Sequence, residues 1–215
     1  ESPEQVLEYP VPDLLADYRW ESFKEKISEL KRNGLLAVSF TIQVFEYTWY
    51  LRGMENLLID MLVNEDMAEA CLDRITEIQK KVSRRLAECD VDMIIFGDDV
   101  ASQRGMIMDP ELWRTWLKPR MRDVIQAAKE VKPDIIAYYH SDGDVYQIIP
   151  ELIEIGVDVL NPIQPECMDP IKVKEEFGER LSFWGTIGTQ TTMPFETPDE
   201  VDKTVKRVIE GVGRN

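Results

Sequence analysis

The sequence predicts an α/β fold built on a parallel sheet. Five short runs of apolar, β-branched and aromatic residues alternate with segments of helical periodicity, and no run alternates apolar with polar residues over its whole length. The last three runs, near residues 135–139, 157–161 and 181–185, start 22 to 24 residues apart, as successive β/α units require. Strands without alternation are expected to be covered on both faces, which favours parallel pairing. An open doubly wound sheet and part of a (β/α)8 barrel both fit this pattern.

Length and composition suit a globular domain with a large core. The chain has 215 residues, of which 44% are hydrophobic. Its formal net charge of −16 argues against nucleic acid or an anionic membrane as a partner. The sequence has no apolar run long enough for a membrane span and no charged-then-apolar leader. Its three cysteines are widely spaced and odd in number, which indicates reduced thiols and a cytoplasmic protein.

The first part of the chain is expected to precede the sheet. Residues 1–20 contain three prolines and are expected to be extended and irregular. Residues 21–32 carry apolar side chains at helical spacing, and the Asn-Gly pair that follows is a typical helix stop. We therefore divide the chain into a leading segment with one helix, residues 1–34, and an α/β domain, residues 35–215.

The first strand is expected at residues 35–41. The aromatic-rich segment 43–53 follows it, and such a segment is more typical of packing under a loop than of a binding site. Residues 54–63 are expected to be helical. Asn64 and the two acids after it then form a good start for a long amphipathic helix, with Cys71 on its apolar face.

The second strand, residues 93–96, runs into Gly-Asp-Asp. An Asp-Pro-Glu sequence then starts a helix over residues 110–131, in which Pro119 should produce a kink. The helices after the last two strands have similar start signals, at Asp169 and at Thr197. The alternation of strand and helix therefore continues to the end of the chain.

Polar residues follow each of the five strands, and His140, the only histidine of the chain, is among them. The carboxyl ends of parallel strands meet at one edge of a sheet, where active sites form. No Gly-x-Gly-x-x-Gly sequence follows a strand, so a dinucleotide site has no support. Successive pairs along this edge are Gln43 and Glu46, Asp98 and Asp99, His140 and Asp142, Asn161 and Gln164, and Thr186 and Gln190. The two neighbouring aspartates should raise the pKa of one of them.

Several segments together resemble the uroporphyrinogen decarboxylase superfamily. They are residues 96–99, 104–113, 118–120, 139–143, 155–164 and 184–187. The similarity runs from about residue 35 to residue 212 and implies a (β/α)8 barrel, of which the five strands would be the third to the seventh. Besides the decarboxylase, the superfamily includes zinc-dependent methyltransferases, which exchange a methyl group between a corrinoid protein and a thiol or other acceptor.

The methyltransferase branch implies a metal centre at the end of the histidine strand. Those enzymes have a His-x-Cys pair there and a third cysteine near the end of the chain, whereas this sequence has His140-Ser141-Asp142. Zinc accepts nitrogen, sulfur or oxygen ligands, and a catalytic zinc needs three from the protein. We predict His140, Asp142 and Cys167 as ligands. The alternatives for the third ligand are Asp98, Asp99 and Glu166. Without a metal, His140 would instead form a hydrogen bond with Asp142 or Asp99.

The decarboxylase branch implies a site without metal. Basic side chains would hold the acidic groups of a tetrapyrrole, and a carboxylate would pair with its protonated pyrrole nitrogen. Asp98 or Asp99 could be that carboxylate, and Arg52 and Arg104 could hold the acidic groups. Tyr50 resembles the substrate-contacting tyrosine of that branch. The arginine-rich first strand of the decarboxylases is not in this sequence.

We therefore predict a metal-assisted methyltransferase that uses zinc and a corrinoid carried by a partner protein. The alternatives are a tetrapyrrole decarboxylase and a non-catalytic subunit that binds a corrinoid protein or a tetrapyrrole, and a homodimer is a further possible assembly. The predicted catalytic residues are Asp98, Asp99, His140 and Tyr50. The predicted substrate-binding residues are Gln43, Arg52, Arg104, Asn161, Gln164 and Gln190.

Overall fold

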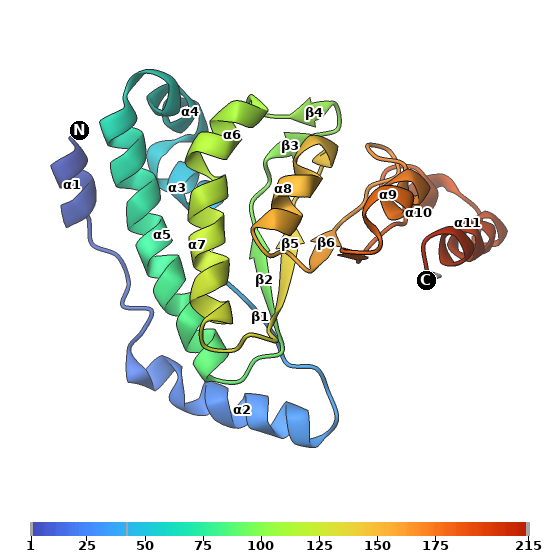
Figure 1. Ribbon diagram of the computed structural model, residues 1–215, viewed down its shortest axis with the longest axis horizontal. Coiled ribbons are helices and arrows are strands. Elements are labelled where there is room, and N and C mark those ends of the chain that lie inside the picture. Colours follow the sequence, from blue (N-terminus) through green and yellow to red (C-terminus); the bar gives the residue numbers. More distant parts are fainter. Residues whose placement is uncertain (1, 42, 214–215) are drawn as a thin grey trace.

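The computed structural model describes residues 2–41 and 43–213. All five predicted strands are present, and they pair in parallel in the order β1-β2-β5-β6-β7 (Figure 1). Their bounds are Val38–Phe40, Met93–Gly97, Ile136–His140, Val159–Asn161 and Ser182–Phe183. The prediction of a parallel α/β sheet is confirmed. A short antiparallel hairpin that the sequence did not predict, β3 (Ala101–Ser102) and β4 (Gly105–Met106), follows β2.

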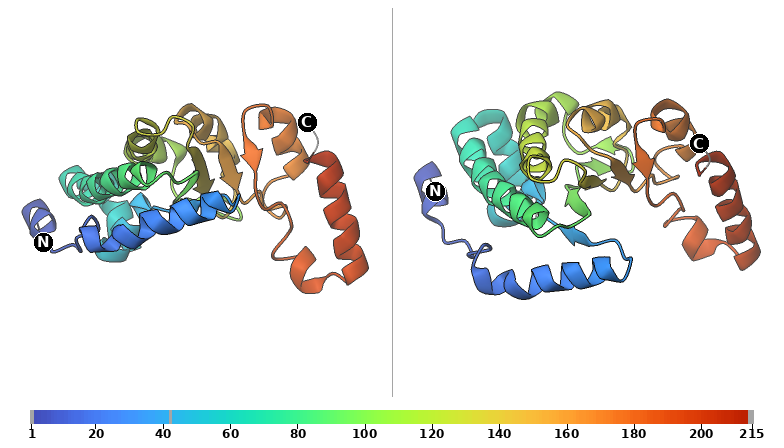
Figure 2. Two further views of the ribbon diagram at one scale, coloured as in Figure 1. Left: turned by 90° about the horizontal axis from the view of Figure 1, so that it is seen from below. Right: turned by 60° about the horizontal axis from the view of Figure 1, so that its bottom comes forward.

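The helices that connect the strands are α1 (Pro3–Glu8), α2 (Glu21–Arg32), α3 (Val44–Arg52), α4 (Met54–Val63), α5 (Glu65–Glu88), α6 (Pro110–Trp116), α7 (Lys118–Lys129), α8 (Ile149–Glu154), α9 (Pro170–Phe177), α10 (Thr192–Phe195) and α11 (Pro198–Gly211). Of these, α5, α7 and α8 form a layer against one face of the sheet, whereas α2 lies across its amino end and α11 lies away from it (Figures 1 and 2). None of the described helices is both long enough and apolar enough to cross a bilayer.

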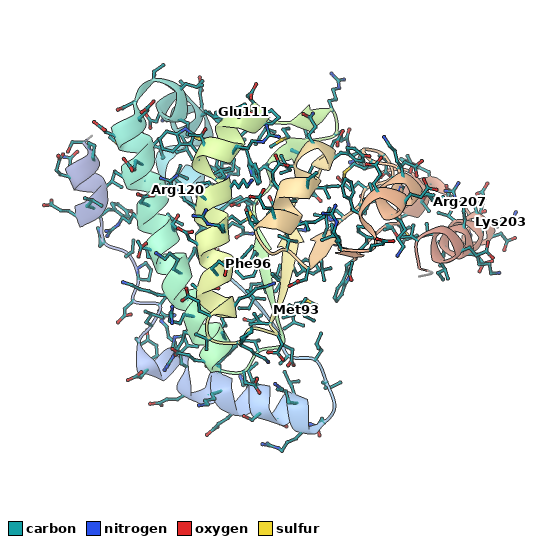
Figure 3. All side chains as sticks on the ribbon, in the orientation of Figure 1. Met93, Phe96, Glu111, Arg120, Lys203 and Arg207 are labelled. Atoms are coloured by element: carbon teal, nitrogen blue, oxygen red, sulfur yellow. The ribbon has the colours of Figure 1, made fainter. Side chains whose placement is uncertain are left out.

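The main hydrophobic core lies between this helical layer and the sheet. The apolar stripe of α5 packs against α7 and the sheet, and Leu72, Ile94 and Ile125 are fully buried there. Figure 3 labels Met93 and Phe96, which lie at the start and near the end of β2, the strand next to β1. At the far end of the chain, α11 carries Lys203 and Arg207 and has no buried residue (Figure 3).

Three predicted helical boundaries need correction. Residues 1–20 are not irregular throughout, because α1 forms there with a capping box between Ser2 and Gln5. Segment 43–53 is the helix α3 and not packing under a loop. The helix predicted over residues 110–131 is divided at Leu117 into α6 and α7. Pro119 lies in the first turn of α7, where its missing N–H removes no hydrogen bond.

The prediction that both faces of the sheet are covered holds only for the middle of the face opposite the helical layer. Met93, Tyr138 and Val159 form a small buried cluster on that face. At the two edges, however, the side chains of Phe40 and Trp184 are 70% and 54% exposed. An arc of parallel strands with helices outside and a partly exposed inner face is the arrangement of part of a barrel wall.

Two aspartates at the amino end of the sheet make equivalent contacts. Asp92, just before β2, accepts a hydrogen bond from the backbone N–H of Ala37 at 2.9 Å and pairs with Lys31 at 3.1 Å and Lys132 at 3.3 Å. Asp158, just before β6, accepts from Ala137 N–H at 2.8 Å and pairs with Lys129, also at 2.8 Å. Each contact joins a strand, its neighbour and a lysine near the end of a helix. The amino end of the sheet is therefore held by paired charges.

Candidate functional site

The polar residues at the carboxyl ends of the strands come together, as the sequence predicts. The register places Gly97, His140 and Asn161 side by side on β2, β5 and β6. Asp99 and Asp142 lie in the turns just beyond the first two of these strands. One ligand atom from each of Asp99, His140 and Asp142 lies within 4.8 Å of the others. We call these three residues the rim triad.

The hydrogen bonds of His140 determine which ring nitrogen carries the proton. Its Nδ1 lies 2.6 Å from Oδ1 of Asn161, and the amide nitrogen of Asn161 donates to the Trp184 carbonyl at 2.5 Å. This second bond fixes the Asn161 amide with its oxygen towards the imidazole, so Nδ1 must be the donor. In the neutral ring Nε2 then has a free lone pair, and it faces Asp99 Oδ1 at 3.7 Å.

Helix α3 contributes a further carboxylate beside the rim triad. Glu46 Oε1 accepts a hydrogen bond from the Asp99 N–H at 3.2 Å, and its other oxygen accepts one from the Tyr50 hydroxyl at 3.3 Å. The charge of Glu46 raises the pKa of Tyr50. Among the described residues no Lys or Arg lies within ion-pair distance of Glu46 or of either rim-triad aspartate. The site is therefore acidic and lacks an internal cation.

Asp98 faces away from this acidic surface. It is 2% exposed and accepts a hydrogen bond from the Glu46 N–H, in the first turn of α3, at 3.0 Å. Burial raises the pKa of Asp98 to about 8, although backbone N–H groups of Phe45, Glu46 and Val44 oppose the shift. In the structure Asp98 holds the start of α3 against β2.

The turn after β5 is held on both sides. Gly143 has φ +86°, and a Cβ atom there would lie 2.6 Å from the Ser102 carbonyl oxygen in β3. On the other side, Oε1 of the buried Gln164 accepts from the Gly143 N–H at 2.6 Å and from the Cys167 thiol at 3.6 Å. Cys167 is not part of the rim triad, in which Asp99, one of the predicted alternatives, is the third member.

The loop before α10 is tied to the rim through Glu166 and Gln190. Glu166 Oε1 accepts from the backbone N–H groups of Gln190 and Thr191 and from the Thr191 hydroxyl at 3.1, 3.0 and 2.8 Å. The side chain of Gln190 forms a hydrogen bond with Gln103 in the β3–β4 turn. The role of Gln103 has no local signal in the sequence, because a two-residue strand has no recognisable periodicity.

The remaining predicted substrate-binding residues occupy different environments. The side chain of Gln43 lies against Gly97, with Cγ 3.2 Å from where a Cβ would be. Arg104 is exposed in the β3–β4 turn and has no carboxylate within ion-pair distance among the residues that the structure describes. Arg52 is bound by Asp60 of α4, with Nε 2.7 Å from Oδ2. It lines a separate cavity on the other side of α3 from Glu46 and Tyr50.

Comparisons with known proteins agree with this architecture. The family model for uroporphyrinogen decarboxylase (URO-D) matches residues 2–215. Among solved structures, a methyltransferase from Methanosarcina mazei aligns with a TM-score of 0.72 and 20% sequence identity, over 87% of this chain and 54% of that chain. The chain thus spans about half the length of this structural neighbour, and at this identity the likeness concerns the fold. No curated protein matches the chain.

Proposed function

Because the chain belongs to the uroporphyrinogen decarboxylase family, we propose that it acts as a metal-assisted methyltransferase that exchanges a methyl group with a corrinoid protein. The rim triad carries the proposal. One imidazole and two carboxylates within 4.8 Å form a ligand set that zinc accepts, with a coordination position left for a substrate. The methyltransferase fold of the structural neighbour is consistent with this choice.

The donor chemistry of the rim triad fits a divalent cation. Metal binding needs a neutral imidazole with a free lone pair, and the hydrogen bond to Asn161 leaves that lone pair on Nε2 of His140. Asp99 and Asp142 lie close together without a basic side chain in ion-pair distance among the described residues. Two such carboxylates repel each other, and a cation between them and His140 would remove this repulsion.

The oxygen-rich ligand set also indicates the type of substrate. A bound metal would act there as a Lewis acid on a coordinated oxygen. Carboxylate ligands suit this task better than activation of a thiol, so a methyl group bonded to oxygen is the donor that we propose. In the transfer, the bond between methyl carbon and oxygen breaks, the corrinoid of the partner receives the methyl group, and the leaving oxygen keeps the electron pair. The leaving oxygen would take its proton from water, because the Tyr50 hydroxyl is engaged by Glu46 and has a raised pKa.

The decarboxylase alternative has less support from the geometry. Asp98 is 2% exposed and holds α3, so it has little access to a pyrrole nitrogen. Arg52 is engaged by Asp60 and lines a different cavity. Of the two predicted arginines, Arg104 alone stays exposed at the rim side of the molecule, where it could contact an anionic group of a substrate.

Metal content tests the proposal. The protein is incubated with Zn²⁺, passed through a desalting column and analysed by plasma mass spectrometry, together with His140→Ala and Asp142→Asn. We expect about one zinc per chain in the unmodified protein, because three ligands converge, and far less than one per chain in each variant, because each loses one of the three ligands. Asp134→Asn is the matched control, since Asp134 is an exposed acid at the opposite end of the same strand.

Two results would contradict the proposal. One is an absence of bound zinc in the unmodified protein while its circular dichroism spectrum is that of a folded α/β protein. The other is equal zinc retention in His140→Ala and in Asp134→Asn. If zinc binds as expected, methyl transfer from methyl ethers to a corrinoid protein is the next measurement.

A further inference from the structure

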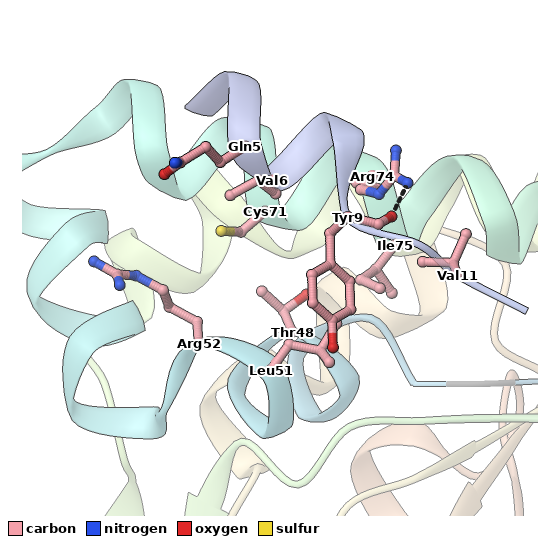
Figure 4. Close-up of a pocket in the computed structure, with 10 residues that line it drawn as sticks. All are labelled: Gln5, Val6, Tyr9, Val11, Thr48, Leu51, Arg52, Cys71, Arg74 and Ile75. Atoms are coloured by element: carbon pink, nitrogen blue, oxygen red, sulfur yellow. Dashed lines mark hydrogen bonds between the residues drawn. The ribbon is translucent and has the colours of Figure 1, made fainter. Parts of the chain in front are cut away.

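A cavity lies between α1, α3 and α5 (Figure 4), and none of the rim-triad residues lines it. Its volume is about 220 Å³. Glu46 and Tyr50 are on the face of α3 that turns to the rim, whereas Thr48, Leu51 and Arg52 line the cavity. The cavity is therefore a separate candidate binding site, to which the methyltransferase proposal assigns no role.

The walls of the cavity are mostly apolar. Val6 comes from α1, Leu51 from α3 and Ile75 from α5, and Val11 and the ring of Tyr9 close one side (Figure 4). Apolar walls of this kind favour a ligand with a hydrocarbon or aromatic part. A cavity of about 150 Å³ with apolar walls holds a benzene molecule. This larger cavity can accommodate a ring or short chain with one additional polar group.

Arg74 supplies an unused positive group at the wall. It is half-buried on α5, and its Nη2 donates to the Tyr9 carbonyl at 2.5 Å. Its Nε is buried and has no hydrogen-bond partner among the described residues. No carboxylate lies within ion-pair distance of Arg74 in the described part of the chain, and its neighbour Asp73 pairs instead with Arg120 at 2.6 Å. A guanidinium has five N–H donors, so several remain for a ligand.

An unpaired arginine is unexpected in so acidic a chain. Acidic residues outnumber Lys and Arg by 41 to 25. The other partly buried arginines of the described chain each have a carboxylate partner; they are Arg52, Arg85, Arg114 and Arg120. A partly buried charge is costly unless it is paired, and an anionic ligand would provide the missing pair.

We infer that the cavity between α1, α3 and α5 binds a small carboxylate with an apolar body. The carboxylate would accept hydrogen bonds from free Nη N–H groups of Arg74, and the apolar body would lie against Val6, Leu51 and Ile75. Because one guanidinium edge can bind both oxygens of a carboxylate, this anion fits better than a spherical one.

Calorimetric titration with hexanoate tests the inference, with 1-hexanol and hexylamine as probes of the same length. We expect hexanoate to bind at least about tenfold more tightly than either, because only the carboxylate forms charge-assisted hydrogen bonds with Arg74. Arg74→Gln should lower hexanoate affinity by at least about tenfold. Lys81→Gln removes one exposed positive charge from the same helix and should leave the affinity unchanged.

A second variant separates loss of the site from loss of the fold. Val6→Phe keeps Arg74 and fills the cavity from α1, so it should also abolish hexanoate binding while the thermal unfolding midpoint changes little. His140→Ala should bind hexanoate normally, which distinguishes this cavity from the rim. Equal affinity for hexanoate and hexanol, or unchanged affinity in Arg74→Gln, would overturn the inference.

Discussion

Aspartates at the two ends of the same sheet have opposite surroundings. At the amino end, Asp92 and Asp158 are each paired with lysine and with a backbone N–H. At the carboxyl end, Asp99 and Asp142 lie close together, and His140 is the nearest group that could carry a positive charge. Paired carboxylates stabilise the fold, whereas crowded ones destabilise it and are available for a ligand. The position of an aspartate along its strand therefore decides whether it serves stability or chemistry.

The different surroundings of the aspartates at the two ends of the sheet should have their largest effect on the pH dependence of stability. The pKa of Asp98 is raised to about 8 by burial. The unfolded chain releases this proton above about pH 4, so the free energy of unfolding should fall as the pH rises towards about 8. The free energy of unfolding should decrease by on the order of a few kcal/mol. Urea unfolding followed by circular dichroism across this range measures it.

The amino end should respond in the opposite direction. Asp90, two residues before Asp92, pairs with the same two lysines, Lys132 at 2.8 Å and Lys31 at 2.5 Å. Their hydrogen bonds lower the pKa of Asp90. The ionised Asp90 therefore contributes to the free energy of unfolding at pH values above its pKa in the unfolded chain. This contribution is lost as the pH falls through its lower pKa in the folded protein. Asp98→Asn should remove the decline in stability between about pH 4 and about pH 8 and leave the acid limb unchanged. An equal decline in this variant and the unmodified protein between about pH 5 and about pH 8 would exclude Asp98 as the source.

A substitution at the amino end should have the next largest effect. Asp92→Ala removes the acceptor of the Ala37 N–H and leaves the buried end of Lys132 with fewer partners. We expect the free energy of unfolding to fall by about 2 kcal/mol. Asp134→Ala is the control, because Asp134 is exposed and close by at the start of β5. If both variants lose the same stability in urea, the amino-end pairing has no special role.

The corresponding change at the carboxyl end should be smaller and of opposite sign. Asp99→Asn keeps an oxygen that can accept from the Asp142 N–H but removes one of the crowded charges. We expect the metal-free protein to gain about 0.5 kcal/mol, because like-charge repulsion decreases. The gain should diminish at high salt, which screens exposed charges. A clear loss of stability of Asp99→Asn at low salt would show that Asp99 and Asp142 do not repel each other in the folded protein.

The sequence was informative about the sheet and about the edge at which the polar residues of the candidate site come together. Five apolar runs with polar ends predicted five parallel strands and one functional edge. The sequence was less informative about the directions of individual side chains, which depend on the path of the backbone in each turn. Asp98 and Asp99 are adjacent, and only the path of the turn after β2 directs one into the core and the other to His140. Likewise, the apolar runs could not indicate that Phe40 and Trp184 stay exposed. A run of apolar residues predicts a strand, but it does not show whether another element packs on that strand.

The repeated contact of Asp92 and Asp158 also matters for building chimeric barrels. Each aspartate connects its own strand to the preceding strand in the sheet and to a lysine of another segment. A recombination crossover between residues 92 and 132 would separate Asp92 from Lys132, whereas one between residues 140 and 158 would separate Asp158 from both Ala137 and Lys129. Fragment exchange with a related barrel should therefore succeed most often when the donor provides an aspartate and a lysine at the same two positions.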